Sequence, residues 1–378
     1  DAGRLDRDGR MRSSYGFSPE CLMPNAEVLT AAGWVQLDQL KRGVPVAQWS
    51  PLDYAVVFDV PTVRSWAYSG PIVVADSPYH RNGYTPNHRI PGHPYQQSFK
   101  DIEAARAATL AHFRLPVSGY YKDGRVHDPA FAQLIVACQA DGHVSEDDEI
   151  TFSLKRARKI ERLQQLCKVA AVDLTIRKKQ RGFFRAAIHK TQAALFLPWI
   201  SSKARTWNSL LLTLDAKSMD AWLDELVHWD GTRGDRKGRA IRYMSTSRNA
   251  VDWAQTIAHL RGWHAQTYIK RRAGTIVIKG QRCHTRTVYY VYLSLGDTRQ
   301  SKRSHYSWRQ YRGTVWCLIT STGYFLCRYK DRIVVTGNTG RLSSSKNPRR
   351  TGANAQNQDR EIRNIFVPDA DCVFMEVD

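Results

Sequence analysis

The segment CLMPNAEVLTAAGWVQLDQLKRG, residues 21–43, opens the region that decides the fold. It begins a series of short apolar runs that continues to about Gly92 and is interrupted by Gly, Pro and Asn. Short runs bounded by such turn residues are typical of β-strands. The runs are EVLT, GWVQL, PVAQW, YAVVFDV and GPIVVA. This pattern predicts an all-β unit that starts at Cys21.

Helical periodicity replaces the strand pattern from about Asp128 to His264. Strand-like segments then return, and the chain is β again after the basic run SKRSHYSWRQYR at 301–312. The sequence therefore predicts an all-β unit split by an α/β insertion. The expected amphipathic helices lie at 131–140, 153–169 and 218–229, and the later strands at 275–278, 288–295 and 315–336.

The insertion contains an approximate internal repeat. LIVACQADG (134–142) and LDELVHWDG (223–231) are each expected to form a helix that ends in Asp-Gly, at Asp141 and Asp230. A polar turn and a second helical stretch follow each copy. A repeat of this kind indicates a fused pseudo-dimer within one monomer. The second helices are expected within 152–166 and 243–260.

The amino-acid composition predicts the type of binding partner and the cellular compartment. Lys and Arg outnumber Asp and Glu by 56 to 35, and this net charge of +21 favours nucleic acid over an anionic membrane surface as partner. No apolar run approaches the roughly 18 residues that a membrane span needs, and the first ten residues lack a signal-peptide core. We therefore expect a cytoplasmic protein. The seven cysteines include no Cys-x-x-Cys pair, which indicates neither a disulfide framework nor a zinc site.

Three sequence blocks mark the edges of the split β unit. The first begins at Cys21, and the second, GYTPNHRIPGH, contains Thr85 and His88 in a Thr-x-x-His arrangement. The third, GTVWCLITSTGYFLCRYKDRIVVTGN, closes on Asn338, which precedes Thr339. In content and order these blocks resemble those of inteins, which are self-splicing proteins of the Hedgehog/intein (Hint) class.

The resemblance implies a role for each of these residues. Cys21 would attack the carbonyl carbon that precedes it and form a thioester. Thr85 and His88 would hold and protonate the scissile amide. Asn338 would cyclise to a succinimide, and the hydroxyl of Thr339 would accept the migrating acyl group. Splicing of this kind requires no metal or cofactor.

The third block departs from the usual pattern of inteins. Gly337 stands where many inteins have a His, and the internal His of the block is missing at 323–325, so other proton donors must serve asparagine cyclisation. Cys317 occupies a position of the third block that Asp often holds. In one intein subclass, a Cys at this position is the first nucleophile. That subclass lacks an initiating Cys and has Trp at the position of Ile90. The route initiated by Cys21 is favoured, with Cys317 as an assisting or branch-forming thiol.

The residues on either side of 21–338 indicate which protein the intein would interrupt. Removal of residues 21–338 joins them into DRDGRMRSSYGFSPETGRLSSSKNP, which resembles family A DNA polymerases just ahead of the first palm motif. Residues 1–20 and 339–378 would then be polymerase fragments of a bacterium or bacteriophage. The resemblance implies that Arg341 contacts template or primer phosphate and that Asp378 is a catalytic aspartate that binds Mg²⁺.

The two repeat segments resemble the LAGLIDADG motif of homing endonucleases. The implied fold is a mixed one, in which an all-β Hint horseshoe (21–126 and 304–338) is split by an α/β pseudo-dimeric endonuclease (127–303). Asp141 and Asp230 would be paired catalytic ligands of Mg²⁺. The substrate would be double-stranded DNA, at a site in the intein-free polymerase gene.

Four residues of the repeat depart from the LAGLIDADG pattern. Gln139 replaces an acid in the first copy, and the second copy has the bulky Trp229 together with Glu225 and His228, which disfavour close packing of the helices. They leave open an alternative, in which the nuclease has decayed to a DNA-binding or structural insertion. Basic stretches interleaved with aromatic residues suit phosphate contact under both interpretations. They are KRARK, RKKQRGFFR, IKRRAG and RQSKRSHYSWRQYR.

Overall fold

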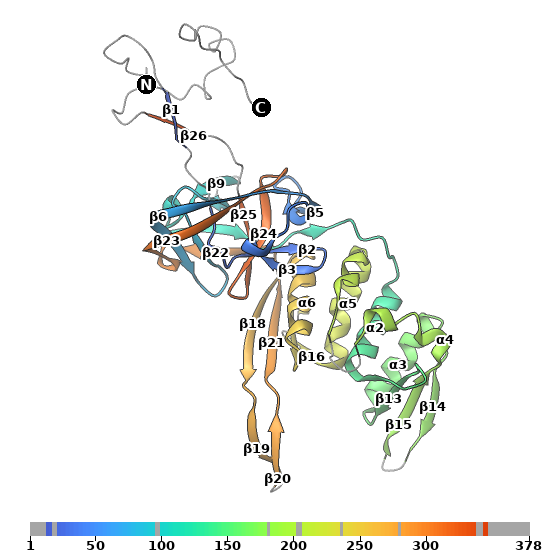
Figure 1. Cartoon of the computed structure of the whole chain (residues 1–378). Helices are drawn as coiled ribbons and strands as arrows, with labels where there is room; N and C mark the ends of the chain where they lie inside the picture. The colour runs from blue at the N-terminus through green and yellow to red at the C-terminus, as the bar shows by residue number, and fades with distance from the viewer. Residues whose placement is uncertain are drawn as a thin grey trace, which may run out of the picture. The chain divides into compact units, whose positions relative to one another are not determined.

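The computed structural model describes residues 13–16, 21–94, 99–179, 182–201, 206–234, 237–278, 281–337 and 343–346. The chain divides into two compact units, one formed by residues 1–19 and 340–378 and the other by residues 20–339. In the first unit, β1 (Ser13–Gly16) pairs antiparallel with β26 (Ser343–Lys346). Strands from the two flanks of the chain therefore lie side by side (Figure 1).

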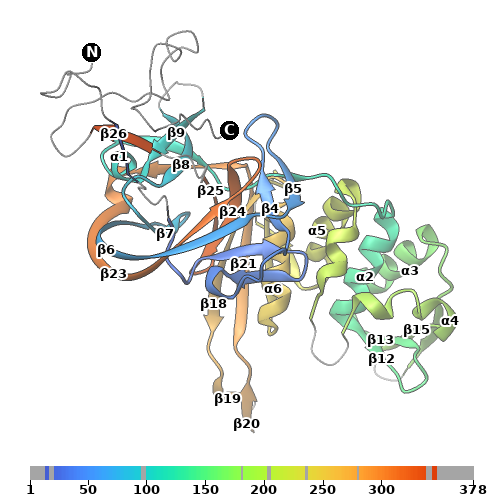
Figure 2. The same cartoon turned by 45° about the horizontal axis from the view of Figure 1, so that its top comes forward.

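The β-rich part of the second unit is built from both ends of residues 21–337. Its largest sheet has seven strands. Six follow the order β11-β5-β4-β2-β24-β25, and the seventh, β3, pairs with β2 off this path. Val28 lies opposite Cys327 in the β2–β24 pair, so early and late strands share one sheet (Figure 2). The strands are β2 (Glu27–Thr30), β3 (Gly33–Gln36), β4 (Val46–Trp49), β5 (Ala55–Asp59), β11 (Tyr120–Tyr121), β24 (Tyr324–Tyr329) and β25 (Arg332–Gly337).

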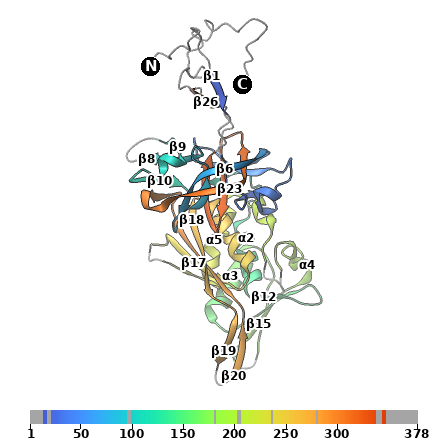
Figure 3. The same ribbon diagram turned by 60° about the vertical axis from the view of Figure 1, so that its left-hand side comes forward.

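A long antiparallel pair joins the two sides of the insertion. β6 (Thr62–Asp76) pairs with β23 (Tyr306–Ile319) along the whole length of β23 (Figure 3). β7 (Arg81–Tyr84) pairs with the end of β6. The basic run at 301–312 is therefore largely strand, whereas the sequence suggested a strand only from residue 315. A third sheet has the order β22-β10-β8-β9. Its strands are β22 (Thr298–Lys302), β10 (His112–Pro116), β8 (Arg89–Pro94) and β9 (Lys100–Glu103), which the short α1 (Ala104–Ala107) follows.

The repeat expected in the insertion is confirmed by its topology. Each copy contributes a four-stranded sheet whose strands, numbered in chain order, are arranged 1-2-4-3. The two motif helices, α2 (Pro129–Asp141) and α5 (Ala216–Trp229), pack against each other. The first sheet contains β12 (Gly142–Val144), β13 (Ile150–Leu154), β15 (Phe184–Ile188) and β14 (Thr175–Lys178). The second contains β16 (Gly231–Arg233), β17 (Ala240–Ser245), β21 (Val288–Leu295) and β18 (Trp263–Arg271).

Side-chain caps explain where the motif helices begin. The Asp128 carboxylate accepts the N–H of Phe131 at 2.8 Å, and that of Asp215 accepts the N–H of Ser218 at 2.8 Å. The later helices are shorter than the sequence suggested, since α3 covers Ala157–Val169 and α6 covers Arg248–His259. A further short helix is α4 (Lys190–Ala193). None of the described helices is long and apolar enough to cross a membrane.

The insertion and the β-rich part share one hydrophobic core. Leu326 and Val335 of the seven-stranded sheet belong to the same buried cluster as Ile257 of α6. At the edge of this contact, the indole N–H of Trp34 donates to the hydroxyl of Thr256 at 2.8 Å. Helix α6 is therefore part of the packing of the β-rich sheet.

A two-stranded extension continues the second sheet of the insertion. β18 and β21 lead into β19 (Gly274–Ile278) and β20 (Gln281–Thr285), which pair only with each other (Figure 1). We call residues 268–290 the basic arm, because the sequence from Trp263 to Leu295 contains no Asp or Glu. Its exposed basic residues include Lys270, Arg271, Arg272, Arg282 and Arg286.

Candidate functional site

Cys21 lies between two strands that come from opposite ends of the β-rich part. Leu22 forms bridges to Trp316 of β23 on one side and to Tyr84 of β7 on the other. The Leu22 N–H donates to the Trp316 carbonyl at 2.8 Å, and the Trp316 N–H donates back at 2.9 Å. In an antiparallel pair, the residue before one member lies opposite the residue after the other. This register places Cys21 opposite Cys317.

Thr85 holds the amide of Cys21 from the other side. The Cys21 N–H donates to Thr85 Oγ1 at 2.8 Å, and the Thr85 N–H donates to the Cys21 carbonyl at 3.1 Å. Both residues are buried. Cys21 and Cys317 also belong to one small buried cluster, together with Met23, Ile72 and Val315. The structure therefore brings together Cys21, Thr85 and Cys317, three of the residues that the sequence predicts for the site.

His88 connects this site to the strand that leads to Asn338. Its backbone N–H donates to the Thr85 carbonyl at 3.0 Å, and its ring stacks on Tyr84 with centroids 4.7 Å apart. His88 Nε2 lies 2.6 Å from Thr336 Oγ1, and both side chains are fully buried. Thr336 belongs to β25, two residues before Asn338.

A buried polar cluster surrounds this pair. The Tyr84 ring stacks on His88, and the Tyr84 hydroxyl lies 2.6 Å from His80 Nε2. His80 Nδ1 lies 3.4 Å from the Tyr306 hydroxyl, which is 2.9 Å from Ser301 Oγ. We call this cluster the junction network; its members are Ser301, Tyr306, His80, Tyr84, Thr336 and His88.

Burial keeps three members of the junction network, His80, Tyr84 and Tyr306, uncharged at neutral pH. It lowers the pKa of His80 to about 3, chiefly through desolvation of the charged ring. Desolvation also raises the pKa of Tyr84 and of Tyr306 above the ordinary tyrosine range. Sequence reasoning missed His80, because a lone histidine in the turn before β7 carries no motif.

The remaining splice residues predicted from the sequence, together with the polymerase residues, lie outside the described residues: Glu20, Asn338, Thr339, Arg341 and Asp378. The described part of β25 ends at Gly337, one residue before Asn338. A Cβ added there would lie 3.1 Å from the ring of Tyr324 and 3.2 Å from the Arg89 carbonyl oxygen. The space next to Gly337 is thus filled, which gives a packing reason for glycine where many inteins have histidine.

Asp141, at the end of α2, is neutralised by a lysine. Lys159 Nζ lies 2.6 Å from Asp141 Oδ2 and 5.4 Å from the centre of the Trp229 ring. The cavity that Asp141 lines is strongly basic. Its charged or titratable lining residues are Asp141, His143, Lys155, Arg156, Lys159, Lys179 and Arg185.

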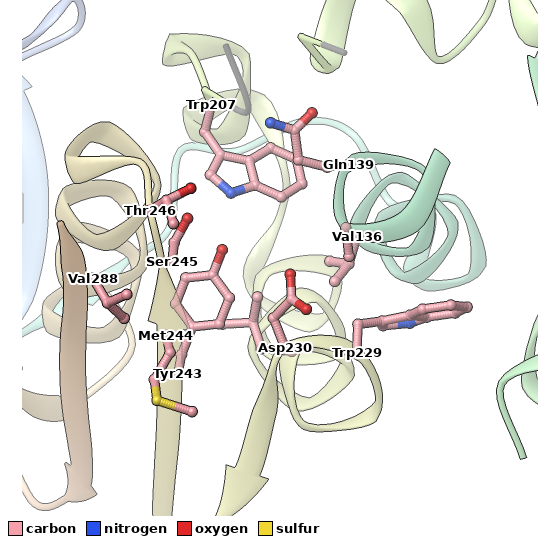
Figure 4. A pocket seen from close by; sticks show the side chains of 12 residues that line it. Val136, Gln139, Trp207, Trp229, Asp230, Tyr243, Met244, Ser245, Thr246 and Val288 are labelled. Atoms are coloured by element: carbon pink, nitrogen blue, oxygen red, sulfur yellow. The ribbon is translucent and has the colours of Figure 1, made fainter. Parts of the chain in front are cut away.

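Asp230, at the end of α5, lines a different cavity. Figure 4 shows Asp230 and Tyr243 pointing into it, with Gln139 on the wall formed by α2. The Gln139 side chain is hydrogen-bonded to backbone groups at Ser201 and Thr206. Its NH₂ group donates to the Thr206 carbonyl at 3.1 Å, and its carbonyl oxygen accepts the Ser201 N–H at 2.9 Å. Asp141 is not among the residues that line this cavity.

These surroundings do not fit a metal site made of protein ligands alone. Within the described ranges, no group of three or more His, Cys, Asp or Glu residues gathers around a common point. Asp141 and Asp230 line separate cavities, and Asp141 is already paired with Lys159. The predicted Mg²⁺ pair therefore has no complete protein site, and the predicted role of Asp378 lies outside the described residues.

A buried ion pair fixes the second motif helix in its place. Arg162 of α3 forms two hydrogen bonds to the Glu225 carboxylate, which also accepts the Trp229 indole N–H at 2.9 Å. The Glu225 side chain is fully buried. Trp229, which the sequence marked as a departure, is thus accommodated by a specific polar contact.

No protein-family model and no curated protein matches this chain. Similar solved structures include a splice-inactive variant of the AceL NrdHF class 3 split intein, at 8% identity and a TM-score of 0.30, covering 85% of this chain and 99% of that one. The homing endonuclease I-DmoI, solved with its target DNA and magnesium, has 13% identity and a TM-score of 0.31, covering 44% of this chain and 89% of its own. The N-terminal LAGLIDADG domain of WhiA has 14% identity and a TM-score of 0.25, covering 43% and 74%. TM-scores this low assign neither fold nor function.

Proposed function

We propose that residues 21–338 excise themselves from the chain and join Glu20 to Thr339. The observation that carries this proposal is the hydrogen bond from the Cys21 N–H to Thr85 Oγ1, at 2.8 Å. It holds the nitrogen atom that has to become an amine when the peptide bond before Cys21 breaks. Cys21, the Thr85–His88 turn and Cys317 come from three places in the sequence and meet at the pairing of β7 and β23 with residues 21–23.

The first step transfers an acyl group from nitrogen to sulfur. Cys21 Sγ attacks the Glu20 carbonyl carbon, so that an S–C bond forms, the C–N bond breaks, and the thiol proton ends on the released amine. The Thr339 hydroxyl then displaces the Cys21 thiol and forms an ester. The side-chain nitrogen of Asn338 attacks its own carbonyl carbon, which breaks the bond to Thr339. The free amine of Thr339 finally converts the ester to an amide.

Expression of the chain between longer flanks tests this proposal. Intact-mass measurement should find a 318-residue product, residues 21–338, together with the joined flanks. Cys21→Ala should stop ligation yet permit cleavage after residue 338, and Asn338→Ala should leave thioester or branched species. Recovery of intact precursor alone, under reducing conditions, would falsify it.

The pairing of β1 with β26 supports the proposed junctions, because it joins the flanks independently of residues 20–339. That these flanks belong to a family A DNA polymerase remains a prediction from their resemblance. So do phosphate contact by Arg341, Mg²⁺ binding by Asp378, and a cytoplasmic location.

For the insertion we propose binding of double-stranded DNA. Arg177 and Arg185 lie directly opposite each other on β14 and β15, and both are exposed. Like charges in such a cross-strand pair repel each other, and an anionic partner relieves the repulsion. The basic arm extends the second sheet with further cations that have no acidic residue nearby in sequence.

Whether the insertion also cleaves the DNA that it binds depends on its two motif aspartates. The two-fold repeat of helices and sheets supports an origin as a LAGLIDADG endonuclease. The Asp141–Lys159 pair and the separate cavities instead favour an insertion that has kept DNA binding without cutting. Digestion of a plasmid that carries the joined flank sequence distinguishes the two outcomes.

A further inference from the structure

Two of the described cysteines lie directly opposite each other on neighbouring strands. Leu22 and Trp316 exchange both of their backbone hydrogen bonds, at 2.8 and 2.9 Å, in an antiparallel arrangement. The next pair in this register is Cys21 and Cys317. Pairs of the two kinds alternate along an antiparallel ladder, so Cys21 and Cys317 form a non-hydrogen-bonded pair, whose Cα atoms lie about 4.5 Å apart. This is the closest approach that two neighbouring strands offer to a pair of side chains.

The packing of the side chains agrees with this register. Residues two apart on a strand lie on the same face, so Cys21 shares a face with Met23, and Cys317 shares one with Val315. All four belong to the same small buried cluster. Leu22, between Cys21 and Met23, belongs to a different cluster. The two thiols therefore project from the same face of the paired strands into one cluster.

The placement of Cys21 and Cys317 fits a disulfide bond. Such a bond requires Cα atoms about 4.4–6.8 Å apart and Cβ vectors that do not point away from each other. The backbone of Cys21 is held by Thr85, whose Oγ1 accepts the Cys21 N–H at 2.8 Å and whose N–H donates to the Cys21 carbonyl at 3.1 Å. Cys317 is held in β23, which pairs with β6 along its whole length. Both residues are thiols in this structure, and their bond requires no rearrangement of the strands.

We infer that Cys21 and Cys317 are a disulfide-forming pair, and that their bond reversibly prevents the first step of splicing. The second half of this inference rests on the proposed function, in which Cys21 Sγ attacks the Glu20 carbonyl carbon. A thiolate is the nucleophile in such a step, and a sulfur bonded to Cys317 Sγ is no longer a thiolate. Reduction of the bond restores the nucleophile. The chain would therefore splice in reducing surroundings and remain a precursor in oxidising ones.

A small disulfide such as glutathione disulfide is a sufficient oxidant. One cysteine thiolate attacks a sulfur of glutathione disulfide, which forms a mixed disulfide and releases one glutathione. The second cysteine thiolate attacks the protein sulfur of this mixed disulfide and displaces the other glutathione. The two cysteines lose two protons and two electrons, and the oxidant becomes two glutathione thiols. Met23, Ile72 and Tyr311 line a cavity of about 560 Å³, so there is space for a small reagent beside the cluster.

Peptide mapping tests the bond itself. The full chain with Asn338→Ala, which does not complete splicing, is incubated with glutathione disulfide, alkylated and digested with trypsin. We expect residues 13–41, which contain Cys21, to be linked to residues 313–328, which contain Cys317 and Cys327. Cys317→Ser should abolish the link. Cys327→Ser, which removes a fully buried thiol of β24, is the matched control and should keep it.

Three mapping results overturn the inference. They are a peptide 13–41 that stays unlinked, one that carries glutathione alone, and one whose link is lost in Cys327→Ser but kept in Cys317→Ser. The first two are read from the parent precursor, so they do not depend on how well either variant folds.

The effect on splicing is measured with hydroxylamine, which cleaves thioesters and leaves disulfides intact. Because oxidation removes the Cys21 thiolate, hydroxylamine-induced cleavage before Cys21 in the Asn338→Ala precursor should fall more than about tenfold and should return after reduction. In Cys317→Ser the same oxidation should change the rate by less than about threefold, because the second thiol of the pair is missing. Equal inactivation of Cys317→Ser contradicts the inference. A reduced parent precursor that hydroxylamine does not cleave contradicts the splicing proposal instead, whereas the mapped disulfide is judged separately.

Discussion

Leu22 and Trp316 exchange two backbone hydrogen bonds, of 2.8 and 2.9 Å, and so hold the residues next to Cys21 against β23. Because of this pairing, Cys21 lies between Thr85 on one side and Cys317 on the other. The proposed nucleophile, the acceptor of its amide proton and a second thiol are therefore already in register.

Removal of the Thr85 hydroxyl should slow the first step. Thr85→Val keeps the shape of the side chain but leaves the buried Cys21 N–H without its acceptor, at a cost of about 1–3 kcal/mol. We expect thiol-induced cleavage in the Asn338→Ala precursor to fall roughly tenfold or more. Thr85→Ser, which keeps the oxygen, should react within about threefold of the parent. Equal rates for the Val and Ser variants would show that the hydrogen bond is irrelevant.

Removal of the Cys21 thiol and removal of the Cys317 thiol should have different effects. Cys21→Ala is expected to abolish thioester formation, measured as cleavage by added thiol. Cys317→Ala should still form the thioester, because Cys21 initiates the reaction, and should slow only the later appearance of joined flanks. The reverse outcome, a thioester that survives Cys21→Ala and is lost in Cys317→Ala, assigns the first nucleophile to Cys317.

The basic arm should contribute measurably to the salt dependence of DNA binding. Each phosphate contact adds about 0.9 to the slope of log K against log salt. Replacing Arg271, Arg272 and Arg282 by Ala should therefore lower the slope by up to about 2.7, measured by fluorescence anisotropy with a duplex of the joined flank sequence. The control replaces Lys41, Arg42 and Arg64, exposed cations of the β-rich part, and should leave the slope unchanged.

Metal ions should not convert binding into cutting. We expect a plasmid with the joined flank sequence to remain supercoiled with the purified protein in Mg²⁺, because Asp141 is paired with Lys159 and Asp230 lines another cavity. Agarose electrophoresis provides the measurement. Linear or nicked DNA that disappears with EDTA, and in both Asp141→Asn and Asp230→Asn, would instead establish the paired-aspartate nuclease.

Acid should weaken the contact between α6 and the β-rich part. His259 is buried and neutral, with Nδ1 2.6 Å from the Val117 carbonyl, and burial lowers its pKa to about 4. Between that value and the unfolded pKa near 6.5, the unfolded chain binds the extra proton, so stability falls as the pH falls. The expected loss is on the order of 3 kcal/mol from pH 7 to 4.

Thermal unfolding of a splicing-dead precursor at several pH values provides the measurement. His259→Gln should be less stable at pH 7 but should show a flatter decline toward pH 4. A variant whose melting temperature falls in parallel with that of the parent would remove His259 as the cause.

The sequence predicted those elements whose pattern is local. EVLT is β2 at Glu27–Thr30, and the helix expected at 131–140 lies within α2. Phe152–Leu154, in contrast, was assigned to a helix and is the end of β13. Ile150, Phe152 and Leu154 alternate in burial with their neighbours, a period of two that the helical stretch immediately after them obscured.

Only those site residues that belong to sequence motifs could be predicted. The blocks identified Cys21, Thr85, His88 and Cys317, and the structure brings these residues together. The rest of the junction network depends on pairing between strands that are distant in sequence, such as β6 with β23, which contains Tyr306. No local pattern reveals that His80 and Thr336, far apart in sequence, belong to one buried polar cluster.

The common core of α6 and the seven-stranded sheet limits how this protein can become smaller. A shortened chain that lacks residues 127–303 would expose Leu29, Leu326 and Val335, all of which are buried. Such a deletion should aggregate unless a substitute cover is supplied, or unless α6 and its bonds to Trp34 and Asp331 are retained. If the proposed splicing holds, a one-step loss of the insertion would therefore also remove the fold that splices, so the insertion would be retained whether or not it cuts DNA.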